Sequence, residues 1–184
     1  SVETGRTLNR QAGSGDVSAP LLYFLPGFSW EYEYKTGSRL TFFYSSSVNT
    51  PGIRQLLPVS NNSNPLYLIA GNRYLKPEYN HNVAGQWFLY DAFTFTTLFV
   101  TLSGAYTQDK ISYSRTIDSR LGQSTTLINV PDDYSASLRS DFSRPVRKLG
   151  INLNLGIRES WNKAFTIVNG SRNTNINWNH SVRF

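Results

Sequence analysis

The sequence predicts an all-β fold of about seven long antiparallel strands. Three observations support this prediction: apolar and polar side chains alternate with a period of two, no stretch sustains a helical period, and short connections alternate with long ones. Successive side chains of a β-strand point to opposite faces, so each predicted strand has one apolar face and one polar face.

Residues 28–35 carry the clearest alternation. Every even position is aromatic, and every odd position is small and polar or charged. Strands of soluble proteins usually bury an aliphatic face. An aromatic row opposite a charged row suits a strand that lies between lipid and a wet interior. The pattern therefore predicts a transmembrane β-barrel strand, with Glu31 and Glu33 facing the interior.

Six further segments alternate in the same way, at residues 40–45, 83–89, 98–103, 134–142, 151–158 and 175–184. Their polar positions place Arg139, Asp141 and Arg158 on the inward face with the two glutamates. We expect the apolar positions to form outward rows that face lipid: Phe28, Trp30, Tyr32, Tyr34, Leu98, Val100, Leu138, Ile151, Leu153, Leu155 and Trp178.

The connections between these segments differ in length. Short ones are expected near residues 35–38, 90–93 and 143–148, and long ones at 47–80, 106–133 and 159–172; residues 1–19, rich in Gly, Ser and Thr, are expected to form a loop. Outer-membrane barrels combine short periplasmic turns with long outside loops. The pattern therefore predicts this topology, with residues 47–80 as a long extracellular loop.

Composition permits a membrane barrel and leaves one soluble alternative open. The 184 residues contain no run of about 18 apolar residues, so no transmembrane helix is expected, but a barrel strand needs only about 9–11 residues. The 4 Trp, 11 Tyr and 11 Phe suit the aromatic girdles of a barrel. They would equally suit the core of a soluble β-sandwich that binds carbohydrate through Trp and Tyr.

Catalytic and metal chemistry are not expected. Cysteine is absent, the two histidines have no partner at metal-ligand spacing, and no Gly-x-Ser-x-Gly motif occurs. We therefore predict no enzyme activity, no metal and no cofactor. The net charge of +6 is scattered except for Arg144, Arg147 and Lys148, so nucleic-acid binding is not expected. The chain opens with Ser1 and has no signal peptide, which suggests part of a longer or processed chain.

Two interpretations apply to the inward charged residues. Arg139, Asp141 and Arg158 either satisfy one another in salt bridges or line a path for a solute, and the salt bridges are the favoured interpretation. For Glu31 and Glu33, contact with water or a neighbouring arginine is favoured over a pair of catalytic carboxylates.

A motif between residues 51 and 78 resembles a known family. It reads Pro-Gly-Ile-Arg-Gln-Leu-Leu-Pro from Pro51, then an Asn-Pro pair, then Gly-Asn-Arg-Tyr-Leu-Lys-Pro-Glu from Gly71. This resembles the outer-membrane β-barrel family of TonB-dependent receptor-like proteins of Bacteroidetes, although Arg73 stands where that family usually has proline. The resemblance covers residues 21–115 well and the rest by pattern. The matching positions are Pro51, Gln55, Leu56, Pro58, Asn64, Pro65, Gly71, Asn72, Leu75, Lys76, Pro77 and Glu78.

The motif residues suit a structured loop. Prolines stiffen the excursion, Gly71-Asn72 suits a turn, Leu75 can anchor the loop, and Pro77-Glu78 precedes the next strand. The motif therefore predicts loop architecture and no catalysis.

The resemblance implies a TonB-dependent outer-membrane receptor or transporter that binds and imports a bulky nutrient. Such barrels have about 22 strands and a plugged lumen, so seven strands would be a portion of a larger barrel. The implied partners are outer-membrane lipid, the remainder of the barrel, a plug domain, TonB through a missing N-terminal part, and a surface lipoprotein. The alternatives are a small self-contained barrel that acts as an anchor or adhesin, and the soluble carbohydrate-binding β-sandwich.

Overall fold

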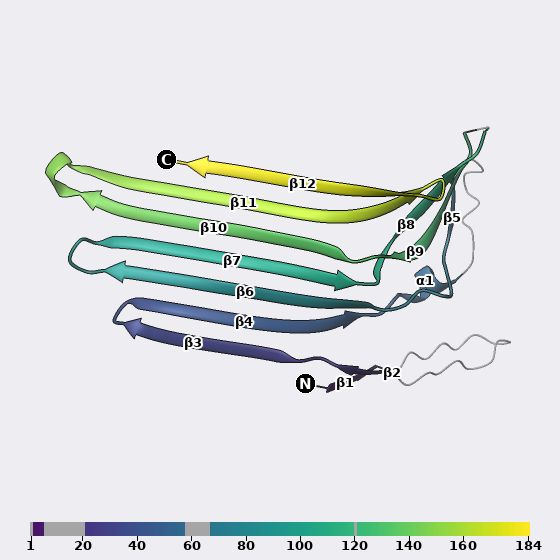
Figure 1. Ribbon diagram of the computed structural model, residues 1–184, viewed down its shortest axis with the longest axis horizontal. Helices are drawn as coiled ribbons and strands as arrows, with labels where there is room; N and C mark the ends of the chain where they lie inside the picture. The colour runs from purple at the N-terminus through teal and green to yellow at the C-terminus, as the bar shows by residue number, and fades with distance from the viewer. Residues whose placement is uncertain (1, 6–20, 58–66, 120) are drawn as a thin grey trace.

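The computed structural model describes residues 2–5, 21–57, 67–119 and 121–184, which form mainly one curved β-sheet (Figure 1). Seven long strands lie side by side, and each is antiparallel to its neighbours. In spatial order they are β3 (Gly27–Lys35), β4 (Ser38–Asn49), β6 (Glu78–Asp91), β7 (Thr96–Gln108), β10 (Asp133–Val146), β11 (Ile151–Val168) and β12 (Ser171–Arg183).

Short strands extend the sheet at one end. There β8 (Lys110–Ile117) pairs in parallel with the end of β11, β9 (Gln123–Val130) pairs antiparallel with β8, and β5 (Tyr67–Ala70) pairs in parallel with β9. The helix α1 (Ile53–Leu56) lies at the same end (Figure 1). We call β5, β8, β9 and α1 the outer layer. The described residues include no helix long and apolar enough to cross a membrane.

The structure corrects the expected number of strands, the loop expected at residues 1–19 and the connection expected at residues 47–80. About seven strands is too low, because β5, β8 and β9 join the sheet and β1 (Val2–Gly5) pairs with β2 (Leu21–Phe24). Within the loop expected at 1–19, residues 2–5 are therefore a strand, and residues 6–19 lie outside the described part. Within the connection expected at 47–80, β4 continues to Asn49, β6 begins at Glu78, and α1 and β5 lie between them. These strands were missed because they are short: β5, β8 and β9 form the outer layer, and β1 and β2 pair only with each other.

The long connection expected at 159–172 is wrong. Strand β11 continues to Val168, and only Asn169 and Gly170 separate it from β12, with positive φ angles of 50° and 75°. The prediction failed because Glu159 and Lys163 interrupt the apolar row. The folded chain gives both of these charges partners: Glu159 accepts a hydrogen bond from the indole of Trp178 at 2.9 Å, and the Lys163 ammonium lies 5.4 Å from the Phe165 ring centroid.

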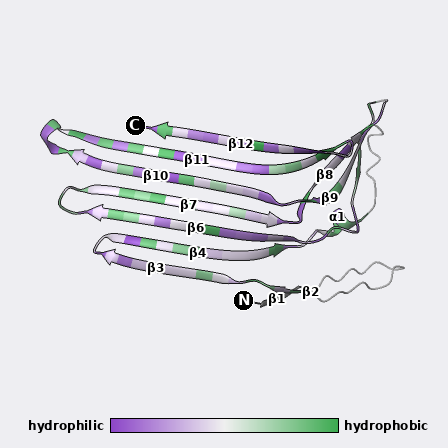
Figure 2. Ribbon diagram, in the orientation of Figure 1, coloured by the Kyte–Doolittle hydropathy of each residue, from purple (hydrophilic) through white to green (hydrophobic). Residues whose placement is uncertain are grey.

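The strand register separates an apolar face from a polar face. Every residue that the sequence predicts to face outward lies on the same face, because the strand pairs align Trp30 with Phe42, Trp87 with Val100, and Leu102 with Leu138. Figure 2 shows the same alternation as bands of hydrophobic and hydrophilic residues along the strands. An outer-membrane barrel turns such an apolar face toward lipid.

The sheet itself has almost no conventional core. Trp30 is 46% exposed, Leu102 60% and Trp178 66%. Several of the few buried apolar side chains lie in or against the outer layer, namely Leu75, Leu127 and Val130. An apolar surface of this extent on a water-soluble monomer would be exceptional, so the apolar face requires another apolar medium.

Candidate functional site

The five predicted inward residues share the polar face and occupy two neighbouring rows across the sheet. The first row runs from Glu31 through Thr41, Gln86 and Thr101 to Arg139, Arg158 and Ser181. The second runs from Glu33 through Arg39, Phe88 and Phe99 to Asp141, Gly156 and Arg183. Strands β4, β6 and β7 separate the two glutamates from the other three candidates.

Two arginines that sequence reasoning missed complete these rows. The guanidinium of Arg39 lies 3.3 Å from the Glu31 carboxylate, and that of Arg183 lies 3.6 Å from the carboxylate of Asp141. Asp141 also accepts a 2.6 Å hydrogen bond from Nε of Arg139. The favoured salt bridge is therefore confirmed for Arg139 and Asp141. Both new arginines stand at polar positions of alternating strands, which is the signal that could have identified them.

Between the charged ends, the polar face is hollowed and carries aromatic rings. Phe88 and Phe99 are partners across β6 and β7, at positions where the alternation predicts polar residues. One hollow of about 520 Å³ is lined by hydroxyl and amide side chains, among them Ser103, Ser137, Ser160 and Asn162, together with apolar residues such as Phe43 and Ala105. A second, of about 300 Å³, includes Ser137, Arg139, Arg158 and Ser160. Such a surface can donate and accept hydrogen bonds and can stack against a flat group. Among the described residues, no group of His, Cys, Asp and Glu could hold a metal ion.

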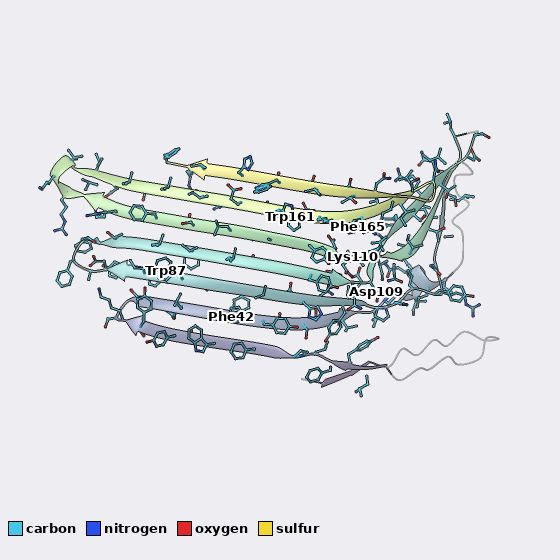
Figure 3. The ribbon with its side chains drawn as sticks, in the orientation of Figure 1. Phe42, Trp87, Asp109, Lys110, Trp161 and Phe165 are labelled. Atoms are coloured by element: carbon cyan, nitrogen blue, oxygen red, sulfur yellow. The ribbon has the colours of Figure 1, made fainter. Side chains whose placement is uncertain are left out.

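The family-like motif forms a clasp between the two long connections. The clasp consists of residues 71–78 and their partners in β8 and β9. The side-chain amide of Asn72 donates to the carbonyl of Leu127 at 2.9 Å. The amide group of Asn129 accepts from the Lys76 N–H at 2.8 Å and donates to the Lys76 carbonyl at 2.9 Å. The Asn129 amide also donates to the carbonyl of Asp109 at 2.7 Å, and Figure 3 labels Asp109 at this end of the sheet. These bonds agree with the role in loop architecture that the sequence predicts.

The other half of the motif packs on the clasp through the backbone. The Asn72 N–H donates to the carbonyl of Gln55 at 2.7 Å, and the Gln55 side chain accepts from the Gly52 N–H at 2.8 Å. A Cβ atom on Gly71 would lie 2.2 Å from the Leu57 carbonyl oxygen, so only glycine fits. Leu75 is buried, Leu56 is half-buried, and β6 starts at Glu78 directly after Pro77. Pro58, Asn64 and Pro65 lie outside the described residues.

Glu78 is a buried acidic residue of the clasp. Its carboxylate is 5% exposed and accepts hydrogen bonds from the Asn49 amide at 2.9 Å and the Ile111 N–H at 2.7 Å. The Lys110 ammonium lies 3.3 Å away. Burial raises the pKa of Glu78, but the two hydrogen bonds and the charge of Lys110 outweigh it and hold that pKa below its ordinary value. A membrane span needs about 9–11 of the 14 residues of β6, and Glu78, its first residue, bonds to β8 of the outer layer, which places it outside the span.

Aromatic side chains gather on the apolar face near the outer layer. The Tyr44 hydroxyl lies 2.6 Å from Nδ1 of His81, the His81 ring stacks on Tyr106, and Tyr106 lies 5.1 Å from Tyr134 between ring centroids. Aromatic rings with polar groups collect where a barrel passes from hydrocarbon to water. The cluster therefore has the composition of one aromatic girdle.

Comparison with known proteins agrees with this geometry. A model of the outer membrane protein β-barrel family matches residues 4–184. A comparison with curated proteins found no match. The matched region includes all seven long strands, the outer layer and the clasp. The chain therefore belongs to the outer membrane protein β-barrel family and resides in the bacterial outer membrane.

Proposed function

We propose that this chain is part of a TonB-dependent outer-membrane receptor that binds and imports a bulky nutrient without chemical turnover. The receptor function is proposed from the family-like motif at residues 51–78, and the observation that supports a portion of a barrel is the direction of the two edge strands. The seven long strands alternate in direction, so β3 and β12 run the same way, and they do not pair with each other among the described residues.

An open edge is not tolerated in lipid, because its N–H and C=O groups would lack partners. Pairing β3 directly with β12 would create a parallel pair, whereas bacterial barrels of this class are antiparallel with an even number of strands. An odd number of additional strands is therefore needed to close the barrel. A small barrel of about eight strands meets this requirement as well as one of about 22 does, so the preference for a large barrel rests on the family-like motif at residues 51–78.

The polar face supports binding of a large polar solute. The two cross-sheet rows present separated charges, two phenylalanine rings and many hydroxyl and amide groups, and no single deep pocket dominates among the described residues. A surface of this kind suits many weak contacts along a lumen. Its ligand would be rich in hydroxyl or amide groups, as glycans, peptides and siderophores are.

The partners that follow from this proposal are a plug domain against the polar face, TonB acting on that plug, and a surface lipoprotein over the outer layer. The sequence motif resembles receptors of Bacteroidetes that work with such partners. In this arrangement the clasp holds the two long connections together around the entrance of the barrel.

Nutrient uptake tests the proposed function. Cells with and without the gene are given a ferric siderophore, a labelled oligosaccharide or a labelled oligopeptide as the limiting nutrient. We expect uptake of one class to require the gene, and we expect depletion of TonB in wild-type cells to abolish that same uptake. Gene-dependent uptake that survives TonB depletion, or no gene-dependent uptake of any class, would contradict the proposal.

Cysteine labelling tests the orientation. Tyr74, in the clasp, and Thr36, in the short β3–β4 turn, are both exposed. A membrane-impermeant maleimide should label Tyr74→Cys in intact cells and should label Thr36→Cys only after the outer membrane is permeabilised. Both sites are exposed, so a difference in labelling reports the side of the membrane. Labelling of Thr36→Cys alone in intact cells would reverse the orientation.

A further inference from the structure

We propose that the β6–β7 and β10–β11 turns bind the phosphate of an anionic glycerophospholipid in the leaflet next to the short turns. The inference rests on the orientation given under the proposed function, with the short turns in the periplasm. It assigns a ligand to Arg144, Arg147 and Lys148, the one tight basic cluster of the sequence.

The three basic side chains converge without a carboxylate partner among the described residues. Arg144 lies in β10 on the apolar face, where it is the register partner of Leu153. Arg147 and Lys148 follow in the 3₁₀ turn η1 (Arg147–Leu149). All three are exposed, and none lies within salt-bridge distance of an acidic side chain of the described residues. Uncompensated positive charge beside hydrocarbon favours a bound anion.

Apolar side chains line the same place. A groove of about 530 Å³ is bordered by the three basic residues together with Phe93, Phe142 and Leu153. Phe142 and Leu153 belong to the apolar face, which continues from the groove along the sheet. A phospholipid whose phosphate is held by the basic residues would therefore extend its acyl chains along the apolar face.

The two neighbouring turns are joined into one site by a cation–π contact. The Arg147 guanidinium lies 4.7 Å from the ring centroid of Phe95, which follows Phe93 in the β6–β7 turn. Phe93 is 92% exposed and Leu149 is 70% exposed. Large apolar side chains this exposed at the tips of turns suit immersion at a membrane surface. Arginine and lysine commonly extend from such positions toward lipid phosphates.

The position of the groove selects among phosphate ligands. Glycerophospholipids form the periplasmic leaflet of an outer membrane, whereas lipopolysaccharide occupies the outer leaflet. Free phosphate would use the basic residues but would leave the apolar walls uncovered. An anionic diacyl lipid such as phosphatidylglycerol satisfies both parts of the groove, and its net negative charge distinguishes it from zwitterionic phosphatidylethanolamine.

Native mass spectrometry of the full-length protein tests the site. The protein is released from detergent micelles that contain equal amounts of phosphatidylglycerol and phosphatidylethanolamine. We expect roughly tenfold more phosphatidylglycerol to remain bound, because three basic side chains attract its net negative charge, which the ammonium group cancels in phosphatidylethanolamine. Equal retention of the two lipids by the unmodified protein would overturn the proposal without need of any variant. Removal of the bound lipid by millimolar inorganic phosphate would also overturn it.

Two matched triple variants locate the preference. The first variant combines Arg144→Gln, Arg147→Gln and Lys148→Gln, and it should bind phosphatidylglycerol and phosphatidylethanolamine in nearly equal amounts. Arg115→Gln with Lys163→Gln and Arg172→Gln removes the same charge at the opposite end of the sheet and should leave the preference unchanged. An equal loss in both variants would refute the assignment. Loss of TonB dependence with the lipid preference intact would refute the transport proposal and leave the lipid site standing.

Discussion

Arginine at Leu102 is expected to lower the free energy of unfolding by about 2–4 kcal/mol, the cost of a basic residue near the midplane of the lipid face of a barrel. Leu102 lies in the middle of β7, on the apolar face, and its side chain is 60% exposed. Its register partners are Gly85 and Leu138. A guanidinium there would have to leave water for hydrocarbon or extend far along the strand.

A denaturant titration of the full-length protein in lipid vesicles measures this loss. The control is Ser103→Arg, one residue further along β7 on the polar face, beside the larger hollow. Its guanidinium would stay in the wet interior, so we expect a much smaller change. Equal losses in the two variants would show that the faces are assigned wrongly.

Removal of the Glu78 carboxylate is the second large effect. In Glu78→Ala the Ile111 N–H and the Asn49 amide lose their acceptor, and Lys110 loses its counter-charge. Buried donors without partners make this change cost about 2–3 kcal/mol. We expect the clasp to open first, which hydrogen exchange at the Ile111 amide would detect as lost protection.

The effect of Glu78 should depend on pH in a defined direction. Because its pKa is lowered in the folded protein, its carboxylate contributes stability above the pKa of the unfolded chain. That contribution is lost as the pH falls through the folded pKa, so the wild type and Glu78→Ala should converge in acid. Glu31→Ala is the control, because its exposed ion pair with Arg39 should contribute less than about 1 kcal/mol. Equal protection of Ile111 in Glu78→Ala and the wild type would contradict the role of the clasp.

Several features follow from the sequence because they depend on local geometry. Side chains alternate across any strand, so the positions of Trp30, Leu138 and Leu153 on one face, and of Glu31 and Arg139 on the other, could be predicted without knowing which strands are neighbours. The same reasoning missed the continuation of β11, because Lys163 breaks the alternation of the apolar row. Its partner, the Phe165 ring, is known only from the structure.

The tertiary structure decided what depends on register and on distant contacts. That Arg183 reaches Asp141, or that Phe88 lies beside Phe99, depends on how the strands are offset, which no single segment specifies. The clasp joins residues more than 50 positions apart, as in the bond from Asn72 to Leu127. The direction of the two edge strands is likewise a property of the whole sheet. Alternation is a property of each strand alone, whereas register, loop docking and edge direction arise only when the strands pair, and that is the physical reason for the division.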